Sequence, residues 1–244
     1  MGPTNTLMRR QQTASPANDG PRDRTSRQSL VDRAYHEIRR RILDNEYPPA
    51  HQVLELELAA ELGMSRTPVR EALVRLQNER FVQLIPRHGM RVVPLSLEDL
   101  RDMYEVLTAL EMTAIERLVR ARPDSRTLEP LRDALDEMDR ALKHGDVDAW
   151  ARADEQFHRT LIDLSGNRRL AAVAYTLWEQ GHRARMTTVH LRASLQKSNR
   201  EHRAVVDAIR RNNWREAKAR HAKHRERATG EIIKLLQQTR LGSF

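Results

Sequence analysis

The chain has 244 residues, enough for two ordinary domains, and its 39% hydrophobic residues suffice for real cores despite 32% charged residues. Aromatic residues make up only 4%, which favours packed amphipathic helices over sheets. The absence of cysteine excludes disulfides, thiolate metal sites and cysteine nucleophiles. No apolar stretch approaches the roughly 18 residues of a membrane span and no secretory signal is evident. We therefore expect a cytoplasmic protein of mainly α class.

The formal net charge of +9 favours a polyanionic partner. This charge is not concentrated in one domain, because residues 28–95 hold 10 arginines against 9 acidic residues. Solvated helix faces explain a positive surplus equally well. The case for nucleic-acid binding therefore depends on where individual arginines lie.

The first 27 residues lack apolar periodicity and are rich in Thr, Ser, Gln, Asn, Pro and Arg. This composition predicts a flexible basic tail over residues 1–27. Apolar residues at helical spacing then predict a first helix that ends before two prolines. These residues are Leu30, Ala34, Ile38 and Ile42, followed by Pro48 and Pro49.

A short helix, a glycine turn and a capped helix come next. The short helix is marked by the apolar residues Leu54, Leu58, Ala59 and Leu62. Gly63 ends it and Ser65 caps the following helix, which is typical of a helix-turn-helix. The free amides and arginines at the start of such a recognition helix suit phosphates and guanine edges. An alternative is that the arginines only form surface ion pairs with Glu61 or Glu71. The predicted DNA contacts are Ser65, Arg66, Thr67 and Arg70.

A hairpin is predicted directly after the recognition helix. Residues 81–85 and 91–94 have the composition of two strands, and a basic turn joins them. Basic side chains at such a tip reach the DNA backbone or the minor groove beside a recognition helix. We therefore add Arg87 and His88 to the predicted DNA contacts.

Residues 58–73, LAAELGMSRTPVREAL, resemble the GntR superfamily of bacterial transcription regulators. The resemblance extends from about Tyr35 to Leu95 and includes the proline break and the hairpin. It implies a winged helix-turn-helix domain over residues 28–95 that binds double-stranded operator DNA.

The resemblance also implies roles for single residues. In that family, arginines matching Arg66 and Arg70 contact operator DNA, and a glycine matching Gly89 at the hairpin tip approaches the minor groove. Members usually have glycine after the recognition helix, where this chain has Arg80. This departure puts the conformation of the turn into the first hairpin strand in doubt.

The remaining sequence, residues 96–240, predicts an all-α domain. Ser96 to Asp99 resembles a capping box and opens a helix that ends near Arg122, before Pro123. Further amphipathic segments complete a predicted bundle of six or seven helices. They cover residues 127–143, 147–164, 168–193, 198–211 and 214–238.

Polar groups interrupt the apolar stripes of three of these helices. Asp154 and His158 share the apolar face of one helix, His202 lies in line with the apolar residues of another, and His221 and His224 do so in the last. Burying such groups unpaired is costly, and imidazoles with a carboxylate suit a divalent metal, zinc first. The alternative is a surface ion pair or a satisfied core histidine.

The pattern of Asp154 and His158 four residues apart, followed by Ser-Gly-Asn, Glu-His and a late histidine, resembles the FCD ligand-binding domain of the FadR-like GntR branch. The resemblance covers about residues 97–235. In metal-binding members an aspartate and three histidines at these positions hold the ion. The resemblance therefore implies Asp154, His158, His202 and His224 as ligands, with His221 one turn away from the last.

The same resemblance implies a small effector, often an organic acid, beside the metal. Many members have an arginine where this chain has Leu107, which puts a simple carboxylate effector in doubt. Arg159, Arg183 and Arg185 are candidate substitutes, and each also fits a solvated surface arginine.

Three functions are compatible with these features. The first is a homodimeric regulator, usually a repressor, whose operator affinity depends on the effector. The second is a metal-dependent enzyme with a DNA-targeting domain, which the lack of an evident general base or nucleophile motif disfavours. The third is an architectural DNA-binding protein, which polar groups inside the helical domain disfavour. We therefore expect a regulator and not an enzyme.

Overall fold

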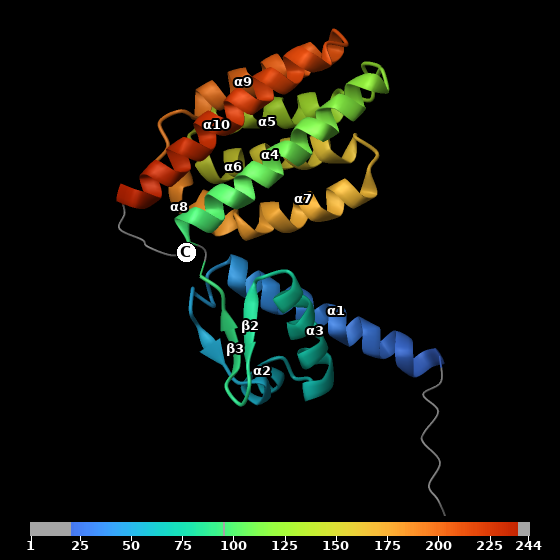
Figure 1. Ribbon diagram of the computed structural model, residues 1–244, viewed down its shortest axis with the longest axis vertical. Coiled ribbons are helices and arrows are strands. Elements are labelled where there is room, and N and C mark those ends of the chain that lie inside the picture. Colours follow the sequence, from blue (N-terminus) through green and yellow to red (C-terminus); the bar gives the residue numbers. More distant parts are fainter. Residues whose placement is uncertain (1–20, 95, 239–244) are drawn as a thin grey trace, which may run out of the picture.

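The computed structural model describes residues 21–94 and 96–238, which form a small sheet-containing unit and a helical bundle joined at the start of α4 (Figure 1). Helices dominate both units, as the composition predicts. The elements of the first unit are α1 (Pro21–Leu43), β1 (Gln52–Val53), α2 (Glu55–Glu61), α3 (Arg66–Asn78), β2 (Val82–Ile85) and β3 (Gly89–Val92).

The first unit has its own hydrophobic core. Helix α1 packs along α3, with Ile38 and Leu73 fully buried between them. Gly63 takes a positive φ of 61° in the turn between α2 and α3, a conformation that glycine adopts without strain. The core therefore fixes the recognition helix α3 against a long supporting helix and leaves its opposite face exposed.

The sheet has three strands in the order β1-β3-β2. Strands β2 and β3 form the predicted hairpin, with Leu84 opposite Met90, and Val53 of β1 lies opposite Met90 on the other edge. The two-strand prediction was thus incomplete. Strand β1 has only two residues, too few to show the alternation of polar and apolar residues by which a strand is recognised.

Two further features of this unit differ from expectation. Helix α1 begins at Pro21, so residues 21–27 are helical, although a flexible tail was predicted for them. Proline suits the first position of a helix, and a helix that projects from the core needs no apolar stripe. The rest of that tail, residues 1–20, lies outside the described residues. Arg80 adopts the left-handed conformation, with φ of 60°, so the turn keeps a geometry suited to glycine despite the substitution.

The described part of the second unit is a seven-helix bundle, within the predicted range. Ser96 and Asp99 form the predicted capping box, since the Ser96 hydroxyl oxygen accepts a hydrogen bond from the Asp99 amide at 3.0 Å. The predicted helix over 168–193 is divided at Gly181. The helices are α4 (Leu97–Arg120), α5 (Glu129–His144), α6 (Val147–Asp163), α7 (Arg168–Gln180), α8 (His182–Val189), α9 (Leu195–Arg210) and α10 (Trp214–Gln238).

Side chains from the α7–α8 region contact the first unit directly. Gln180 Nε2 donates to the backbone oxygen of Glu79 at 2.7 Å, and Arg183 Nη2 donates to that of Val93 at 3.2 Å. Glu179 also forms an ion pair with Arg39 of α1. The two units are therefore joined by polar contacts as well as by the chain. Over the same residues, no helix has the length and apolar character that crossing a membrane requires.

Candidate nucleic-acid interface and metal centre

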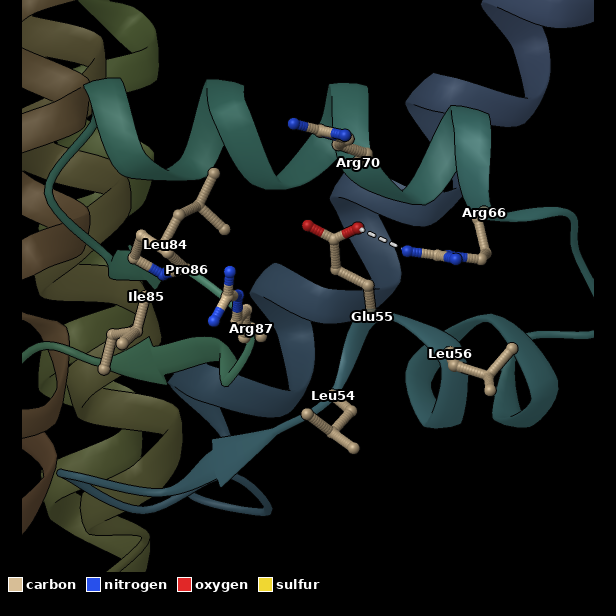
Figure 2. A pocket seen from close by; sticks show the side chains of 10 residues that line it. Leu54, Glu55, Leu56, Arg66, Arg70, Leu84, Ile85, Pro86 and Arg87 are labelled. Atoms are coloured by element: carbon tan, nitrogen blue, oxygen red, sulfur yellow. Dashed lines mark ion pairs between the residues drawn. The ribbon is translucent and has the colours of Figure 1, made fainter.

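The start of α3 and the hairpin tip enclose a concavity of about 530 Å³. Arg66 and Arg70 enter it from α3 and Arg87 enters it from the hairpin (Figure 2). Gly89 of the hairpin also lines it. A shallower neighbouring hollow is lined by Arg66, Thr67 and Arg70. The structure thus brings five of the seven predicted DNA contacts together on one face.

The other two predicted contacts lie at the edges of this face. Ser65 is the exposed N-cap residue of α3, and its side chain makes no capping hydrogen bond. His88 is exposed at the hairpin turn, with its Nδ1 at 2.9 Å from the backbone oxygen of Pro86. Both side chains therefore remain accessible to a partner on the same side of the molecule.

Arg66 forms an ion pair that the sequence did not indicate. Its Nη2 lies 3.7 Å from Glu55 Oε2, whereas Glu61 pairs with Arg41 at 2.7 Å (Figure 2). The side chain of Arg66 is 64% exposed, so this pair is weakly held. A phosphate or guanine can therefore compete for the guanidinium at little cost.

The position of Gly89 has a backbone explanation. Its φ is +77°, and a Cβ placed on it would lie 2.1 Å from the backbone oxygen of Val53. Any side chain here would push the hairpin away from β1. Glycine at this position therefore sets how closely the hairpin tip packs against the start of α2.

Three predicted metal ligands converge in the bundle. His158, His202 and His224 come from α6, α9 and α10, and their candidate ligand atoms lie within 4.8 Å of one another. The Nε2 atoms of His202 and His224 are 2.9 Å apart, and all three residues are at most 2% exposed. Asp154 lies at the edge of this group, with Oδ1 at 3.7 Å from His202 Nδ1.

Carboxylates lie beside two of the histidine rings. Glu201 Oε2 accepts a hydrogen bond from Nδ1 of His224 at 2.8 Å, whereas Glu111 Oε1 lies 3.0 Å from Nδ1 of His158 without hydrogen-bond geometry. A carboxylate on Nδ1 places the proton there and leaves Nε2 with a free lone pair. The residues therefore fit a metal ion, because Glu201 prepares the opposite ring nitrogen of His224 as a ligand and the three histidines converge on one point.

The ionisation of the cluster suits the same role. Burial lowers the pKa of His202 and of His224 well below the usual value, and neighbouring histidines lower both further. Burial alone would raise the pKa of Glu111, but Arg225 and His158 outweigh it and hold that pKa well below its usual value. The cluster thus combines the neutral imidazoles of His202 and His224 with an ionised carboxylate, which are the forms that bind cations.

His221 belongs to a second, overlapping group. Its Nε2 lies 2.9 Å from Glu111 Oε2, and together with His158 these residues also satisfy the spacing of a metal site. Arg225 Nε lies 3.1 Å from the same Glu111 oxygen. Sequence reasoning assigned no role to Arg225 or to Glu111. The signal available for Glu111 was a carboxylate in the apolar stripe of α4 that includes Leu107.

The three arginines that are candidates for binding the effector differ in their surroundings. Arg159 pairs with Glu155 at 2.9 Å, and Arg183 contacts the first unit. Arg185 stacks over Trp178, with its guanidinium carbon 4.0 Å from the ring centre, and its Nη2 has no hydrogen-bond partner among the described residues. Arg183 Nη1 is likewise without a partner among the described residues, but of the three arginines it is Arg185 that stacks on Trp178, which packs against His158.

Comparisons with known proteins agree with this two-part organisation. Residues 30–92 match the model of the bacterial regulatory proteins of the gntR family, and residues 102–227 match that of the FCD domain. An HTH-type transcriptional regulator from the TAR-I ttuE-ttuC′ intergenic region of Agrobacterium vitis is 42% identical over 153 residues, covering 62% of this chain and 90% of that protein.

Two further matches are informative. The gluconate operon transcriptional repressor of Bacillus licheniformis is 34% identical over 137 residues, 56% of each chain. The solved structure of McbR/YncC from E. coli has the same fold, with a TM-score of 0.71 and 19% identity over 84% of this chain and 98% of that one. This chain therefore belongs to the GntR family of DNA-binding bacterial transcription regulators and carries an FCD domain.

Proposed function

We propose that the protein is a homodimeric repressor whose affinity for operator DNA depends on a divalent metal and an anionic effector in the FCD domain. The observation that carries this proposal is the convergence of His158, His202 and His224 with a carboxylate behind two of the rings. We propose a dimer because helix-turn-helix proteins commonly bind as dimers, with one recognition helix in each of two operator half-sites. The similarity to a gluconate operon repressor supports repression.

For the metal we propose zinc, held by the three histidines and Asp154. His224 donates its Nδ1 proton to Glu201, so its Nε2 atom carries a lone pair. The hydrogen bond between the two facing Nε2 atoms therefore has its proton on His202. That proton lies where the ligand atoms converge, and a bound cation would replace it. Zinc would supply an electrophilic centre for an oxygen of the effector.

For the effector we propose an anion held beside the metal by Arg185 and Arg225. Four buried donors near Trp178 lack hydrogen-bond partners among the described residues, and buried donors are normally satisfied. An anionic ligand would satisfy them and replace the arginine missing at Leu107. The donors are Tyr104 Oη, Trp178 Nε1, Arg185 Nη2 and Arg225 Nη2.

The test compares His202→Ala with His190→Ala, a control whose side chain is 57% exposed outside the cluster. Elemental analysis of protein purified without chelator or histidine tag should find zinc in the wild type and control but not in His202→Ala. The melting temperature should fall only in His202→Ala, because an ion that binds the native state stabilises it. Wild-type protein without any bound metal, and with a melting temperature that added zinc leaves unchanged, would contradict the proposal.

A further inference from the structure

Two exposed leucines lie on the surface that carries the arginines of the recognition helix. Leu54 is 42% exposed and Leu56 is 65% exposed, and both line the same concavity as Arg66 and Arg70. Figure 2 shows them on the segment facing α3, with the arginines across from them. Most large apolar side chains of this unit are instead buried in its core.

The two leucines also go against local preference. Leu54 is the N-cap residue of α2, a position at which leucine is among the poorest choices because it offers no acceptor to the free amides. Leu56 follows in the first turn and contributes nothing to the core. Residues that break local rules without benefit to the fold are expected at functional sites.

Duplex DNA offers one apolar group in its major groove, the 5-methyl group of thymine. Arg66 and Arg70 favour phosphates and guanines on the same surface, so a partner that satisfies both arginines and leucines must carry anionic and methyl groups together. We infer that Leu56, with Leu54 beside it, reads thymine methyl groups in the operator. The inference rests on the proposed placement of DNA against α3 and adds a base preference to it.

The experiment uses the full chain and the duplex that it selects from a random-sequence library. This duplex is resynthesised with deoxyuridine in place of one thymidine at a time, which removes the methyl group and keeps every hydrogen-bonding group of the base. At a thymine read by Leu56, wild-type affinity should fall about fourfold, the factor that burial of one methyl group supplies. Leu56→Ala should bind both duplexes with equal affinity.

Two variants serve as controls. Leu56→Met should keep the discrimination, because methionine preserves an apolar contact of similar size. Leu191→Ala should behave as wild type, since Leu191 is a similarly exposed leucine, 53%, that lies outside the DNA-binding unit. Leu56 itself is too exposed for its truncation to disturb the fold.

The outcomes separate this inference from the placement of the DNA. If Arg70→Ala binds the selected duplex normally, the placement against α3 is wrong and the inference falls with it. Suppose instead that Arg70→Ala loses binding but Leu56→Ala discriminates thymine from uracil at the same positions as the wild type. Then only the inference is wrong. A selected site in which no thymine is sensitive to uracil in the wild type would also overturn it.

Discussion

Gln180, the last residue of α7, donates a hydrogen bond to the backbone oxygen of Glu79, the C-cap residue of the recognition helix. Two residues before Gln180, the indole of Trp178 packs on His158, with ring centres 4.7 Å apart. A continuous series of contacts therefore connects the histidine cluster to the end of α3. Such a connection can couple metal binding to DNA binding if the contact differs between the two states.

We predict that Gln180→Ala retains zinc but loses much of the effect of zinc on operator affinity. Couplings of this kind typically amount to about 1–3 kcal/mol. Fluorescence anisotropy with labelled operator, with zinc and after chelation, measures the effect. Gln196→Ala, at an exposed position of α9, is the control. An unchanged ratio of the two affinities in Gln180→Ala would exclude this route.

The covalent junction at residues 94–96 is the second route between the units. Inserting several glycines there should weaken effector control only in part, because the contacts of Gln180 and Arg183 bridge the units independently. Combined with Gln180→Ala and Arg183→Ala, the insertion should abolish control while each unit still binds its own ligand. Titrations of the single and combined variants check this, and full control in the combined variant would mean that neither route is used.

Arg66→Ala and Arg70→Ala should each abolish specific operator binding in a folded protein. Both side chains are exposed, so their loss leaves the core intact, and loss of one bidentate base contact costs about 1–3 kcal/mol. Electrophoretic mobility shifts at several salt concentrations measure the effect, with Arg210→Ala on α9 as the control. Wild-type affinity in both variants would show that the recognition helix is misplaced.

Arg80→Gly should stabilise the protein by about 0.5–1 kcal/mol. The left-handed conformation costs a residue with a side chain about 1–2 kcal/mol, and the greater freedom of glycine in the unfolded chain offsets part of this gain. Urea denaturation measures the change. The same substitution at Arg101, within helix α4, should destabilise by about 1 kcal/mol instead. A loss of stability in Arg80→Gly would mean that the arginine side chain contributes more than the strain it causes.

Glu201→Gln should weaken zinc binding by about 10–100-fold, the usual effect of losing a carboxylate behind a histidine ligand. Glu201 holds Nδ1 of His224 at 2.8 Å and also pairs with Arg227 at 2.6 Å. Competition with a fluorescent chelator measures the zinc affinity. Glu226→Gln, on the exposed face of α10, should bind zinc as the wild type does. Equal affinities for both variants would show that Glu201 does not support the metal.

Much of the fold was predictable because its signals are local. Ser96 and Asp99 mark a helix start through their own hydrogen bonds, and the apolar stripes of the bundle repeat over many turns. The division at Gly181 was missed because the helical pattern continues through it. Packing favours glycine at this position, since a Cβ at Gly181 would lie 2.7 Å from the Cε atom of Met103.

The candidate sites were predictable to different extents. The histidines stood out because each interrupts an apolar stripe, and the arginines of α3 because they follow a helix cap. Glu111 also interrupts an apolar stripe, but its partners, like those of Glu201, could not be assigned from the sequence, since they depend on which helices become neighbours. For the same reason the ion pair of Glu55 with Arg66 appears only in three dimensions.

The short strand β1 has a consequence for how operators can diverge. Because β1 pairs with β3 and Gly89 packs against Val53, the hairpin tip and the start of α2 are held as one rigid frame beside α3. With DNA placed against α3 as proposed, this frame sets the distance along the DNA between the bases that the helices read and the point that the hairpin tip reaches. Substitutions on α2 or α3 would then change which bases are preferred and leave that distance unchanged.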